Sequence, residues 1–437
     1  MADLKQLARR IFHETLAAID IPATMQRKLR RERTRLLCGE KTFDLRDYEK
    51  IRVVAAGKAA HAVVEGLAKV LAPFIRFEGV VAAPALPQKQ VNGLKYFAAG
   101  HPVPNEESWK AAEAILALLK KCNEKTLVFF LLSGGGSALM ELPLDARQTL
   151  QDVQQIHHAL VTCGASIEEI NTVRKHLSAM KGGRLAVAAG KATKITLGVS
   201  DVPVGKESAL ASGPTLPDPT TVVEANRIIA EYRLAEKFPA TLRRWLEEGK
   251  MPETPKASDP AFGNAHFSLL LGMDDLFHPA HRAAEAEGFI ACCDNATDDW
   301  PVEKAAEYLV RQLEELRKIN HGQRVALIAD GEVSSPVTGN GVGGRNSAFV
   351  LACVEKIAGE KMAVLSAGTD GIDGNSPAAG AVANGQTLDL ARKFGLDAAD
   401  ALCRSDAHTF FSRLDDLIVT GPTGNNLRDL RILLADR

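Results

Sequence analysis

Residues 126–140 read TLVFFLLSGGGSALM, and this stretch decides the fold class because it joins a buried strand to a glycine turn and a short helix. Its first seven residues, 126–132, form an almost continuous apolar run, which is typical of a strand covered on both faces of a parallel sheet. Three consecutive glycines follow. They remove every side chain from the turn, so backbone N–H groups and the helix N-terminus can approach an anion.

The serines that flank the glycines add hydroxyl donors to this turn. We therefore expect it to bind a phosphate group through five residues, Ser133, Gly134, Gly135, Gly136 and Ser137. The alternative is a tight strand-to-helix turn that binds nothing, although such a turn rarely requires more than one glycine.

The segments around this stretch alternate in the same way. Short apolar runs predict strands over residues 51–56, 79–83, 95–99 and 194–199, and longer amphipathic runs predict helices over 59–71, 108–121, 145–163 and 167–180. Strands that alternate with helices form a parallel sheet with helices on both of its faces. The first half of the chain is therefore predicted to be α/β.

The alternation resumes after GKMPETPKASDP at 249–260, a segment rich in proline and small polar residues. Strands are predicted over 262–271, 289–293, 323–329, 362–367 and 417–420, with helices over 301–319 and 345–358. We interpret the segment as a linker. The prediction is thus two α/β domains, residues 1–255 and the smaller 256–437.

Charge and composition exclude several classes of partner. The 437 residues contain 53 Lys and Arg against 54 Asp and Glu, so the net charge of -1 provides no overall field for nucleic acid or an anionic membrane. The basic run 27–35 is interpreted as a solvated helix face or a domain contact. The longest apolar stretch, 127–132, is far shorter than the ~20 residues of a membrane span. We expect a chain with no membrane segment, working as a monomer or homodimer.

The cysteines and the N-terminus indicate where the protein works. Seven cysteines are scattered without Cys-x-x-Cys pairs or zinc-type spacing, which is typical of a reduced compartment. The N-terminal residues predict an amphipathic helix and not a signal peptide. The expected location is therefore the cytoplasm.

Two further glycine loops carry basic residues. Gly57 and Lys58 follow the strand at 51–56, and a lysine in the first turn of a helix is unfavourable unless an anion lies there, although a solvated lysine is an equal alternative. Residues 339–344 match G-x-G-x-x-G, but roughly nine residues separate them from the preceding strand, contrary to the dinucleotide fingerprint. A loop that aims Arg345 at a phosphate or carboxylate fits better.

Acidic residues also follow predicted strands. Asp370 and Asp373 stand among glycines and can bind Mg²⁺, while capping of a turn is the commoner role of any one Asp-Gly. Asp201, at the end of the strand 194–199, suits a general base, a metal ligand or a turn cap. Helical spacing puts Arg174 and Lys181 on one face, which can receive a carboxylate or remain a solvated surface. Backbone donors, basic residues and aspartates together are what phosphoryl transfer requires.

Seven segments in order resemble one family over nearly the whole chain. They are GKAA (57–60), LLSGGGSALM (131–140), INTVRKHLSAMKGGRLA (170–186), SDVP with ASGPT (200–203 and 211–215), GNGVGGRNSA (339–348), AGTDGIDG (367–374) and VTGPTGNN (419–426). This series is similar to the glycerate 2-kinases that end in a MOFRL domain, some of which carry the older label hydroxypyruvate reductase. The resemblance implies a Rossmann-like first domain, a smaller MOFRL-type second domain and a cleft between them.

The resemblance also implies the reaction: phosphorylation of D-glycerate at its 2-hydroxyl by ATP with Mg²⁺, giving 2-phosphoglycerate and ADP. Lys58 and Arg345 match the basic active-site pair of the family and are assigned to transition-state charge. Asp201 matches the aspartate of its SDV motif and is assigned to the hydroxyl. Gly57 joins the nucleotide site, while Arg174, Lys181 and Asn346 are expected to bind substrate.

The chain departs from the family pattern at two places, and other functions stay open. Residues 204–208 read VGKES where the family has an acidic turn, and residues 424–429 read GNNLRD where it has GTNVND. The first change puts metal use and substrate choice in question. The alternatives are an NAD(P)H-dependent hydroxypyruvate reductase, which needs a dinucleotide fingerprint in the right context, and a non-catalytic protein that binds nucleotide or sugar acid.

Overall fold

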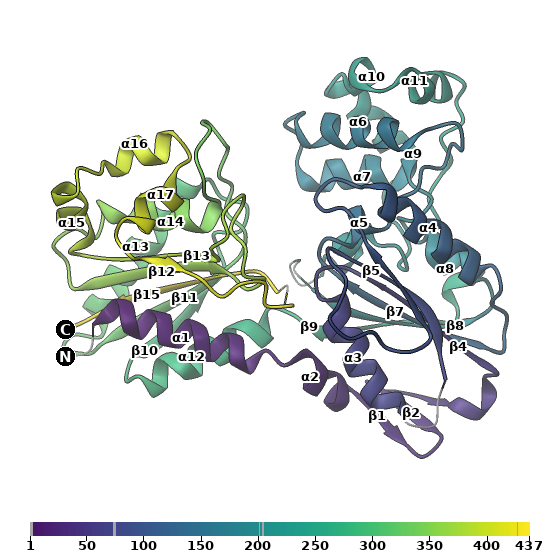
Figure 1. The fold of residues 1–437 in the computed structure, drawn as a ribbon, viewed down its shortest axis with the longest axis horizontal. Coiled ribbons are helices and arrows are strands. Elements are labelled where there is room, and N and C mark those ends of the chain that lie inside the picture. The colour runs from purple at the N-terminus through teal and green to yellow at the C-terminus, as the bar shows by residue number, and fades with distance from the viewer. Residues whose placement is uncertain (1–2, 73–75, 201, 203–204, 426) are drawn as a thin grey trace. The chain divides into compact units, whose positions relative to one another are not determined.

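The computed structural model describes residues 3–72, 76–200, 202, 205–425 and 427–437 (Figure 1). The chain forms two compact units. Ile21–Gly272 is the parallel-sheet unit, and Met1–Asp20 together with Met273–Arg437 is the mixed-sheet unit. Two α/β domains are thus present as predicted, but their division differs from residues 1–255 and 256–437 at both ends of the first domain.

The parallel-sheet unit is built on six parallel strands in the order β6-β5-β4-β7-β8-β9. The strands are β4 (Lys50–Ala56), β5 (Glu78–Ala83), β6 (Leu94–Ala98), β7 (Thr126–Ser133), β8 (Thr193–Val199) and β9 (Ala265–Leu271). This is the 3-2-1-4-5-6 order of doubly wound dinucleotide-binding folds, in which ligands bind where the chain reverses direction from the first strand. The loops after β4 and β7 therefore lie at the switch point.

Helices cover both faces of this sheet. The side chains of Val54, Val128 and Phe130 pack with α4 (Glu106–Leu119) and α8 (Arg184–Ala188), while α3 (Ala60–Leu71) and α2 (Ile21–Lys28) lie outside that cluster and contact the sheet separately. Because strand side chains alternate between faces, residues such as Phe129 and Leu131 point the other way. All eight residues of β7 are buried, as its continuous apolar run predicts.

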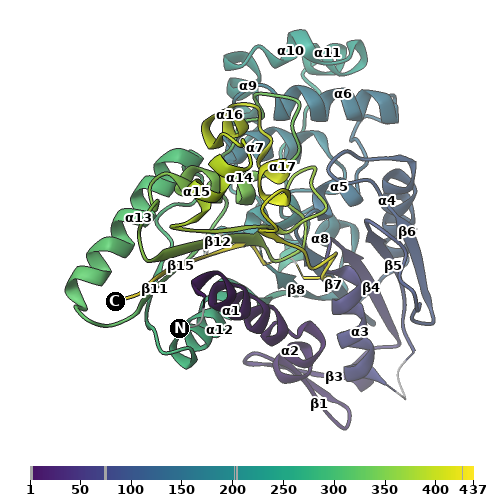
Figure 2. The same ribbon diagram turned by 60° about the vertical axis from the view of Figure 1, so that its left-hand side comes forward.

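A helical cap is inserted after β7 and β8. It consists of α6 (Leu150–Val161), α7 (Ile167–Leu177), α9 (Val222–Glu231), α10 (Leu234–Lys237) and α11 (Ala240–Glu247). The helices share a core that includes Ile156, Val173 and Phe238. Capping boxes begin α6, α7 and α9, and each satisfies backbone donors that a helix start leaves unpaired. Figure 2 shows this layer beyond the carboxyl ends of β7 and β8.

The basic run 27–35 does not lie on one helix face. It leaves the end of α2 and turns through a three-stranded antiparallel sheet of β1 (Leu29–Glu32), β2 (Arg35–Cys38) and β3 (Lys41–Asp44). Arg31 covers the end of α3 by donating to the carbonyls of Leu71 and Ala72. The predicted helix face was wrong. In β1 buried Leu29 is followed by exposed Arg30, and in β2 exposed Arg35 is followed by buried Leu36. This alternation has the period of two that is typical of a strand.

The mixed-sheet unit has six strands in the order β10-β11-β15-β12-β13-β14. They are β10 (Ile290–Asp294), β11 (Val325–Asp330), β12 (Met362–Gly368), β13 (Gly380–Asn384), β14 (Leu417–Ile418) and β15 (Asp429–Ala435). β15 runs antiparallel between β11 and β12, which are therefore parallel to each other. The carboxyl ends of β11 and β12 and the start of β15 meet at one edge.

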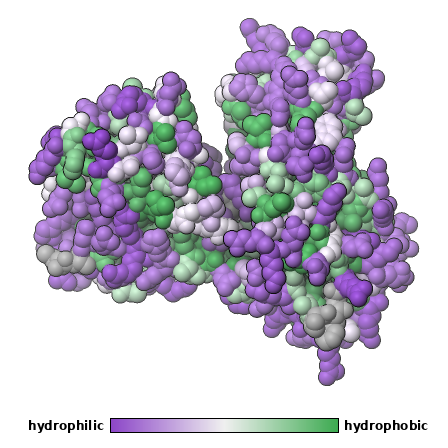
Figure 3. Space-filling model, in the orientation of Figure 1, coloured by the Kyte–Doolittle hydropathy of each residue, from purple (hydrophilic) through white to green (hydrophobic). Residues whose placement is uncertain are grey.

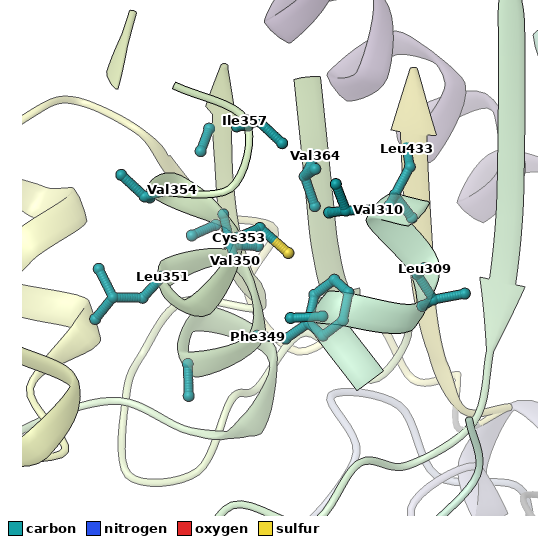
Figure 4. Packing of buried hydrophobic residues seen from close by; sticks show 14 of the residues in the cluster. Leu309, Val310, Phe349, Val350, Leu351, Cys353, Val354, Ile357, Val364 and Leu433 are labelled. Carbon is teal, nitrogen blue, oxygen red and sulfur yellow. The ribbon is translucent and has the colours of Figure 1, made fainter. Parts of the chain in front are cut away.

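Helices also cover both faces of the mixed sheet. One layer contains α13 (Val302–Ile319), α14 (Arg345–Val354), α15 (Thr387–Lys393), α16 (Ala398–Cys403) and α17 (Ala407–Ser412). In Figure 4, Phe349 and Val350 of α14 lie near Val364 of β12 and Leu309 of α13. The other face is covered by α1 (Leu4–Ala18) and α12 (Asp274–Ala286). The remaining short helices are α5 (Gly136–Leu139), η1 (Leu45–Asp47), η2 (Glu207–Ser212) and η3 (Pro260–Phe262).

Two elements explain why the predicted division differs from the observed one. β9 pairs with β8 from Lys194↔Ala265 onward, so the segment 256–272 belongs to the first sheet. The predicted amphipathic helix at the N-terminus forms as α1, but its buried residues, including Ile11 and Phe12, pack against β12 and β15. An ion pair between Lys5 and Asp416 at 2.6 Å joins α1 to the same unit.

Hydrophilic side chains cover most of the visible surface (Figure 3). Within the described part of the chain, every helix is too short or too polar to cross a bilayer.

Candidate active site

The two glycine loops at the switch point of the parallel sheet are joined by hydrogen bonds. The backbone N–H of Lys58 donates to the carbonyl of Gly134 at 2.9 Å, and that of Ala59 donates to Ser133 Oγ at 3.1 Å. Gly57 has φ +135°, and a methyl group there would overlap Ser133 Oγ and its carbonyl. Ser133 is 1% exposed. Its hydroxyl therefore holds the loops together, and its predicted contact with phosphate stays a prediction.

Gly135 forms the part of the turn that the side chains of Lys58 and His101 cross. It has φ +83°, and a Cβ there would lie 2.9 Å from His101 Cδ2 and 3.5 Å from Lys58 Cγ. His101 follows β6, so its ring and the Lys58 side chain reach the turn from different strand ends. The turn thus offers a glycine backbone flanked by an ammonium group and an imidazole, which suits an anion.

A chain of three side chains orients Ser137. Ser212 Oγ donates to Asn171 Oδ1 at 3.1 Å, so the 3.0 Å contact between Ser137 Oγ and Ser212 Oγ has Ser137 as the donor. Ala211, Ser212 and Gly213 all have φ between 50° and 61°. Non-glycine residues adopt this left-handed conformation at a cost of order 1–3 kcal/mol, and such strain collects at functional sites.

Lys181 is a buried residue that holds the glycine turn in place through the backbone of Ser137. Its Nζ donates to the carbonyl of Ser137 at 2.9 Å and forms an ion pair with Glu141, whose other oxygen accepts from Ser178 Oγ at 2.5 Å. Burial lowers the pKa of Lys181, and Glu141 opposes that change. At 1% exposure, Lys181 positions the glycine turn rather than reaching substrate as predicted.

Arg174 and His157 lie beside this group. An Arg174 Nη donates to His157 Nδ1 at 3.2 Å. Burial lowers the pKa of Arg174, and burial together with the nearby charges of Arg174, Lys181 and His101 lowers the pKa of His157 to about 4. His157 is therefore neutral near pH 7. The predicted substrate residue Arg174 is at this site, whereas His101 and His157 were not predicted.

Asp201, the proposed base, lies outside the described residues. Close to it in sequence, Lys206 forms an exposed ion pair with Glu168 at 2.7 Å, and Glu207 accepts from the Gly205 backbone. The lysine that replaces the acidic turn of the family is thus paired with the first turn of α7.

The mixed-sheet unit carries a second charged cluster, at the edge where β11, β12 and β15 meet. Arg345 begins α14, and its guanidinium pairs with Asp429 at 2.5 Å and Glu332 at 2.7 Å. Burial disfavours the charged form of Arg345, but the two carboxylates outweigh burial and raise its pKa. Asn346, predicted to bind substrate, is 1% exposed and instead accepts from Ser366 Oγ at 2.6 Å.

The two aspartates predicted to bind Mg²⁺ have structural roles. Asp373 is 2% exposed, and its carboxylate accepts from the backbones of Asn346 and Ser347 and from Ser347 Oγ, which caps α14. Asp370 accepts from the backbone of Ile372, as in a turn cap. Among the described residues, no three His, Cys, Asp or Glu side chains gather as a metal site. These residues do not fit a magnesium site made of protein ligands alone.

The glycines of 339–344 serve close packing within their own unit. A Cβ on Gly341 would lie 2.6 Å from Asp406 Cα, and one on Gly339 would overlap the Arg404 carbonyl. The turn at 404–406 therefore occupies the space that these glycines leave open. This packing argues against the alternative of a dinucleotide fingerprint, which needs its glycines beside the pyrophosphate.

Arg428, one of the departures from the family pattern, is buried between two aspartates. It donates to Asp330 at 3.1 Å and Asp298 at 2.5 Å. Asp330 is fully buried, and its Oδ1 has no hydrogen-bond partner among the described residues. Burial raises the pKa of Asp330, while Arg428 opposes that rise. The side chain at this departure thus neutralises a second buried carboxylate beside the Arg345 cluster.

Sequence reasoning missed most of the partners in both clusters. Glu332 and Asp429 lie at or close to the ends of the observed strands β11 and β15, so position near a strand end was a usable signal. His157 and Asn171 lie on helices of the cap, and no local pattern marks them. What the arrangement can do is bind small anions at the turn 133–137 and hold arginine charge at the N-terminus of α14.

Comparisons with known proteins cover nearly the whole chain. Residues 7–247 match a family model described as a domain of unknown function (DUF4147), and residues 325–429 match the MOFRL family. The chain is 35% identical to D-glycerate 2-kinase of Thermotoga maritima over 90% of this chain and 92% of the relative. A relative from Agrobacterium vitis, 37% identical over 98% of this chain and 94% of its own, carries the provisional name hydroxypyruvate reductase.

A crystal structure of glycerate kinase from Thermotoga maritima has the same fold. It superposes with a TM-score of 0.81 at 32% identity, covering 99% of each chain.

Proposed function

Because the chain belongs to the glycerate kinase family with a MOFRL domain, we propose that it transfers the γ-phosphoryl group of ATP to the 2-hydroxyl of D-glycerate. The products are 2-phosphoglycerate and ADP. A bond forms between the substrate oxygen and the γ-phosphorus, the bond to the bridging oxygen of ADP breaks, and the hydroxyl proton passes to Asp201, the base that the SDV motif indicates. Catalysis of this kind depends on positioning and on neutralising charge around the transferring oxygens.

One observation carries this proposal: a glycine turn flanked by the Lys58 side chain lies at the switch point of a doubly wound sheet. The turn 133–137 provides backbone donors, and Lys58 crosses Gly135 from the neighbouring loop. These groups fit the phosphates of ATP because amide donors and an ammonium group can approach them without intervening side chains. ATP supplies the phosphoryl group when bound. Lys58 then counters the negative charge that develops during transfer.

We assign Arg345 to transition-state charge and Asp201 to the substrate hydroxyl. The assignment of Asp201 rests on the SDV motif, since this residue is outside the described ones. Arg345 is held by Asp429 on the buried side, which fixes the direction of its guanidinium. For Mg²⁺, we propose entry with the nucleotide, because this ion commonly keeps its waters and is bound by phosphates with only one or two carboxylates.

The chemistry separates the kinase from a hydroxypyruvate reductase. Purified protein is mixed with D-glycerate, ATP and Mg²⁺, and ADP release is followed with a coupled assay, while the position of the new phosphate is read by ³¹P and ¹H NMR. We expect ADP and 2-phosphoglycerate in equal amounts. Oxidation of NADH by hydroxypyruvate without ADP formation would overturn the proposal.

The residue assignments need their own variants with matched controls. Lys58→Ala and Arg345→Ala should each lower kcat about 100-fold or more, since transition-state charge contacts are worth several kcal/mol. The controls are Lys69→Ala and Arg404→Ala, which remove exposed ion pairs within the same units as the residues they match. If either active-site variant kept kcat within a few-fold of its control, that assignment would be wrong.

A further inference from the structure

Positive charge exceeds negative charge beside the glycine turn. Arg174, Lys181 and His101 lie close enough to His157 to lower its pKa, and Glu141 is the carboxylate that acts on Arg174. This cluster draws on α6, α7, the turn that follows α7, and the loop after β6. The cluster therefore combines the cationic side chains of Arg174 and Lys181 with the imidazoles of His101 and His157, from four segments of one unit.

Arg174 has no ion-pair partner of its own among the described residues. Glu141 already pairs with Lys181 through one oxygen and accepts from Ser178 and the Leu142 backbone through the other. Within the described part of the chain, Arg174 forms no ion pair; its hydrogen-bond partner is the neutral ring of His157. A guanidinium that is largely withdrawn from water without a carboxylate is stabilised by an incoming anion.

The contact between the two side chains determines the state of His157. Because Arg174 can only donate, His157 Nδ1 is the acceptor and carries no proton. The ring proton is therefore on Nε2, which points away from the guanidinium because the two ring nitrogens face nearly opposite sides of the imidazole. The uncharged ring holds one N–H of Arg174 and leaves the other donors of the fork for the two oxygens of one carboxylate.

We propose that Arg174 binds the carboxylate of the substrate and that His157 positions the Arg174 guanidinium for this contact, which determines selectivity for a hydroxy acid over the corresponding alcohol. This inference rests on the proposed function and extends it to a residue outside the motifs of the resemblance. His157 orients the Arg174 fork through Nδ1, so its loss should weaken acid binding without changing nucleotide binding.

The neighbouring residue provides a matched control. His158 is exposed at the next position of the same helix, so His158→Leu removes an imidazole from α6 that lies away from Arg174. His157→Leu removes the acceptor that holds Arg174. His157→Gln keeps an amide oxygen for Arg174, so it should recover most of the affinity that the leucine variant loses.

The test measures KM for D-glycerate, KM for ATP and kcat, with glycerol as the substrate that lacks the carboxylate. We expect His157→Leu to raise KM for D-glycerate about 10-fold or more, with kcat and KM for ATP changed less than about threefold. The preference for D-glycerate over glycerol should fall by the same factor. His158→Leu should match the wild type. An unchanged KM for D-glycerate, or an equal rise in both KM values, would overturn the proposal.

Direct binding separates this inference from the proposed function. D-glycerate and glycerol are titrated into wild type and His157→Leu by calorimetry without nucleotide. We expect D-glycerate to bind the wild type and to bind the variant at least about 10-fold more weakly, whether or not ADP is formed in the kinase assay. If wild type releases no ADP but shows this difference, the proposed function fails and the carboxylate subsite stands. Equal affinity of both proteins for D-glycerate, or no binding to either, overturns the subsite.

Discussion

Replacing Gly135 by alanine tests whether the glycine turn acts through its backbone alone or through the side chains that cross it. The residue has φ +83°, and a Cβ would meet His101 at 2.9 Å and Lys58 at 3.5 Å. Gly164, in the connection between α6 and α7, has φ +85° with nothing within 4 Å of a Cβ. The two glycines impose the same backbone strain and differ only in what a methyl group would touch.

The magnitudes follow from these two terms. An L-residue in the left-handed region costs roughly 1–2 kcal/mol, so both alanine variants should lose about that much of their free energy of unfolding. Carbon atoms in contact prefer at least about 3.5 Å, so the ring of His101 must move by roughly 0.6 Å when Cβ is added to Gly135. Since a 1 Å misplacement can cost about 100-fold in rate, we expect Gly135→Ala to lose about 10- to 100-fold in kcat/KM.

Urea unfolding gives the first quantity and ADP release at varied ATP and D-glycerate gives the second. Gly164→Ala should be destabilised to the same extent and keep its kcat/KM within about twofold of wild type, because its methyl group points into open space. If both variants had the same kcat/KM, the positions of His101 and Lys58 over the turn would have no bearing on activity. The reasoning from close approach would then be refuted.

Three further variants test structural assignments. Asp373→Asn should lose about 1–2 kcal/mol of unfolding free energy because it weakens the cap of α14, while the Mg²⁺ concentration for half-maximal activity stays unchanged; a raised Mg²⁺ requirement without destabilisation would make Asp373 a ligand. Burial opposes ionisation of Glu253, which follows α11, but hydrogen bonds from the Lys256 side chain and from the Val222 and Thr254 backbones hold its pKa at about 2. Its stabilisation is thus present above the unfolded pKa near 4.3 and lost as pH falls toward 2, so Glu253→Gln should flatten the acid limb of urea stability measured from pH 5 to 2. Arg428→Asn should cost about 3–5 kcal/mol by leaving Asp330 buried without its cation, and adding Asp330→Asn should restore part of that loss in urea unfolding.

The parallel sheet could be predicted from sequence because its inner strands, such as β7 and β8, are buried on both faces. Runs such as 126–132 are apolar throughout, and the observed strands match the predicted ones within a few residues. The mixed sheet was harder. β13 is GAVAN, whose small residues have little strand preference, and α12 continues through Pro279, which a helix pattern treats as a break. In both elements, tertiary packing overrides local preference.

The candidate site also contains parts that could be predicted from sequence and parts that could not. Glycine loops report on backbone conformation and close approach, both of which are local, so the turn 133–137 was found from sequence. Side-chain partners are not local: Arg345 and Asp429 are 84 residues apart, and His157 contacts Arg174 across a helix connection. The same limit explains Lys181 and Asn346. Their residue types suit a ligand, and only the structure shows that buried neighbours already occupy their polar atoms.

The two arginines of the proposed mechanism differ in what an incoming anion must displace. Arg174 has no carboxylate partner among the described residues. An incoming anion can therefore pair with its guanidinium without displacing another carboxylate. Arg345 is held by Asp429, which is 5% exposed, and by Glu332, which is 40% exposed. The Arg345 side chain is itself 37% exposed, so a phosphate can approach it and compete with Glu332, the partner that water can also replace. Because of this competition Arg345 adds little to binding of the ground state, and it contributes where the charge on the transferring oxygens is greatest. Arg174→Ala should therefore raise KM for D-glycerate, and Arg345→Ala should lower kcat with little change in KM.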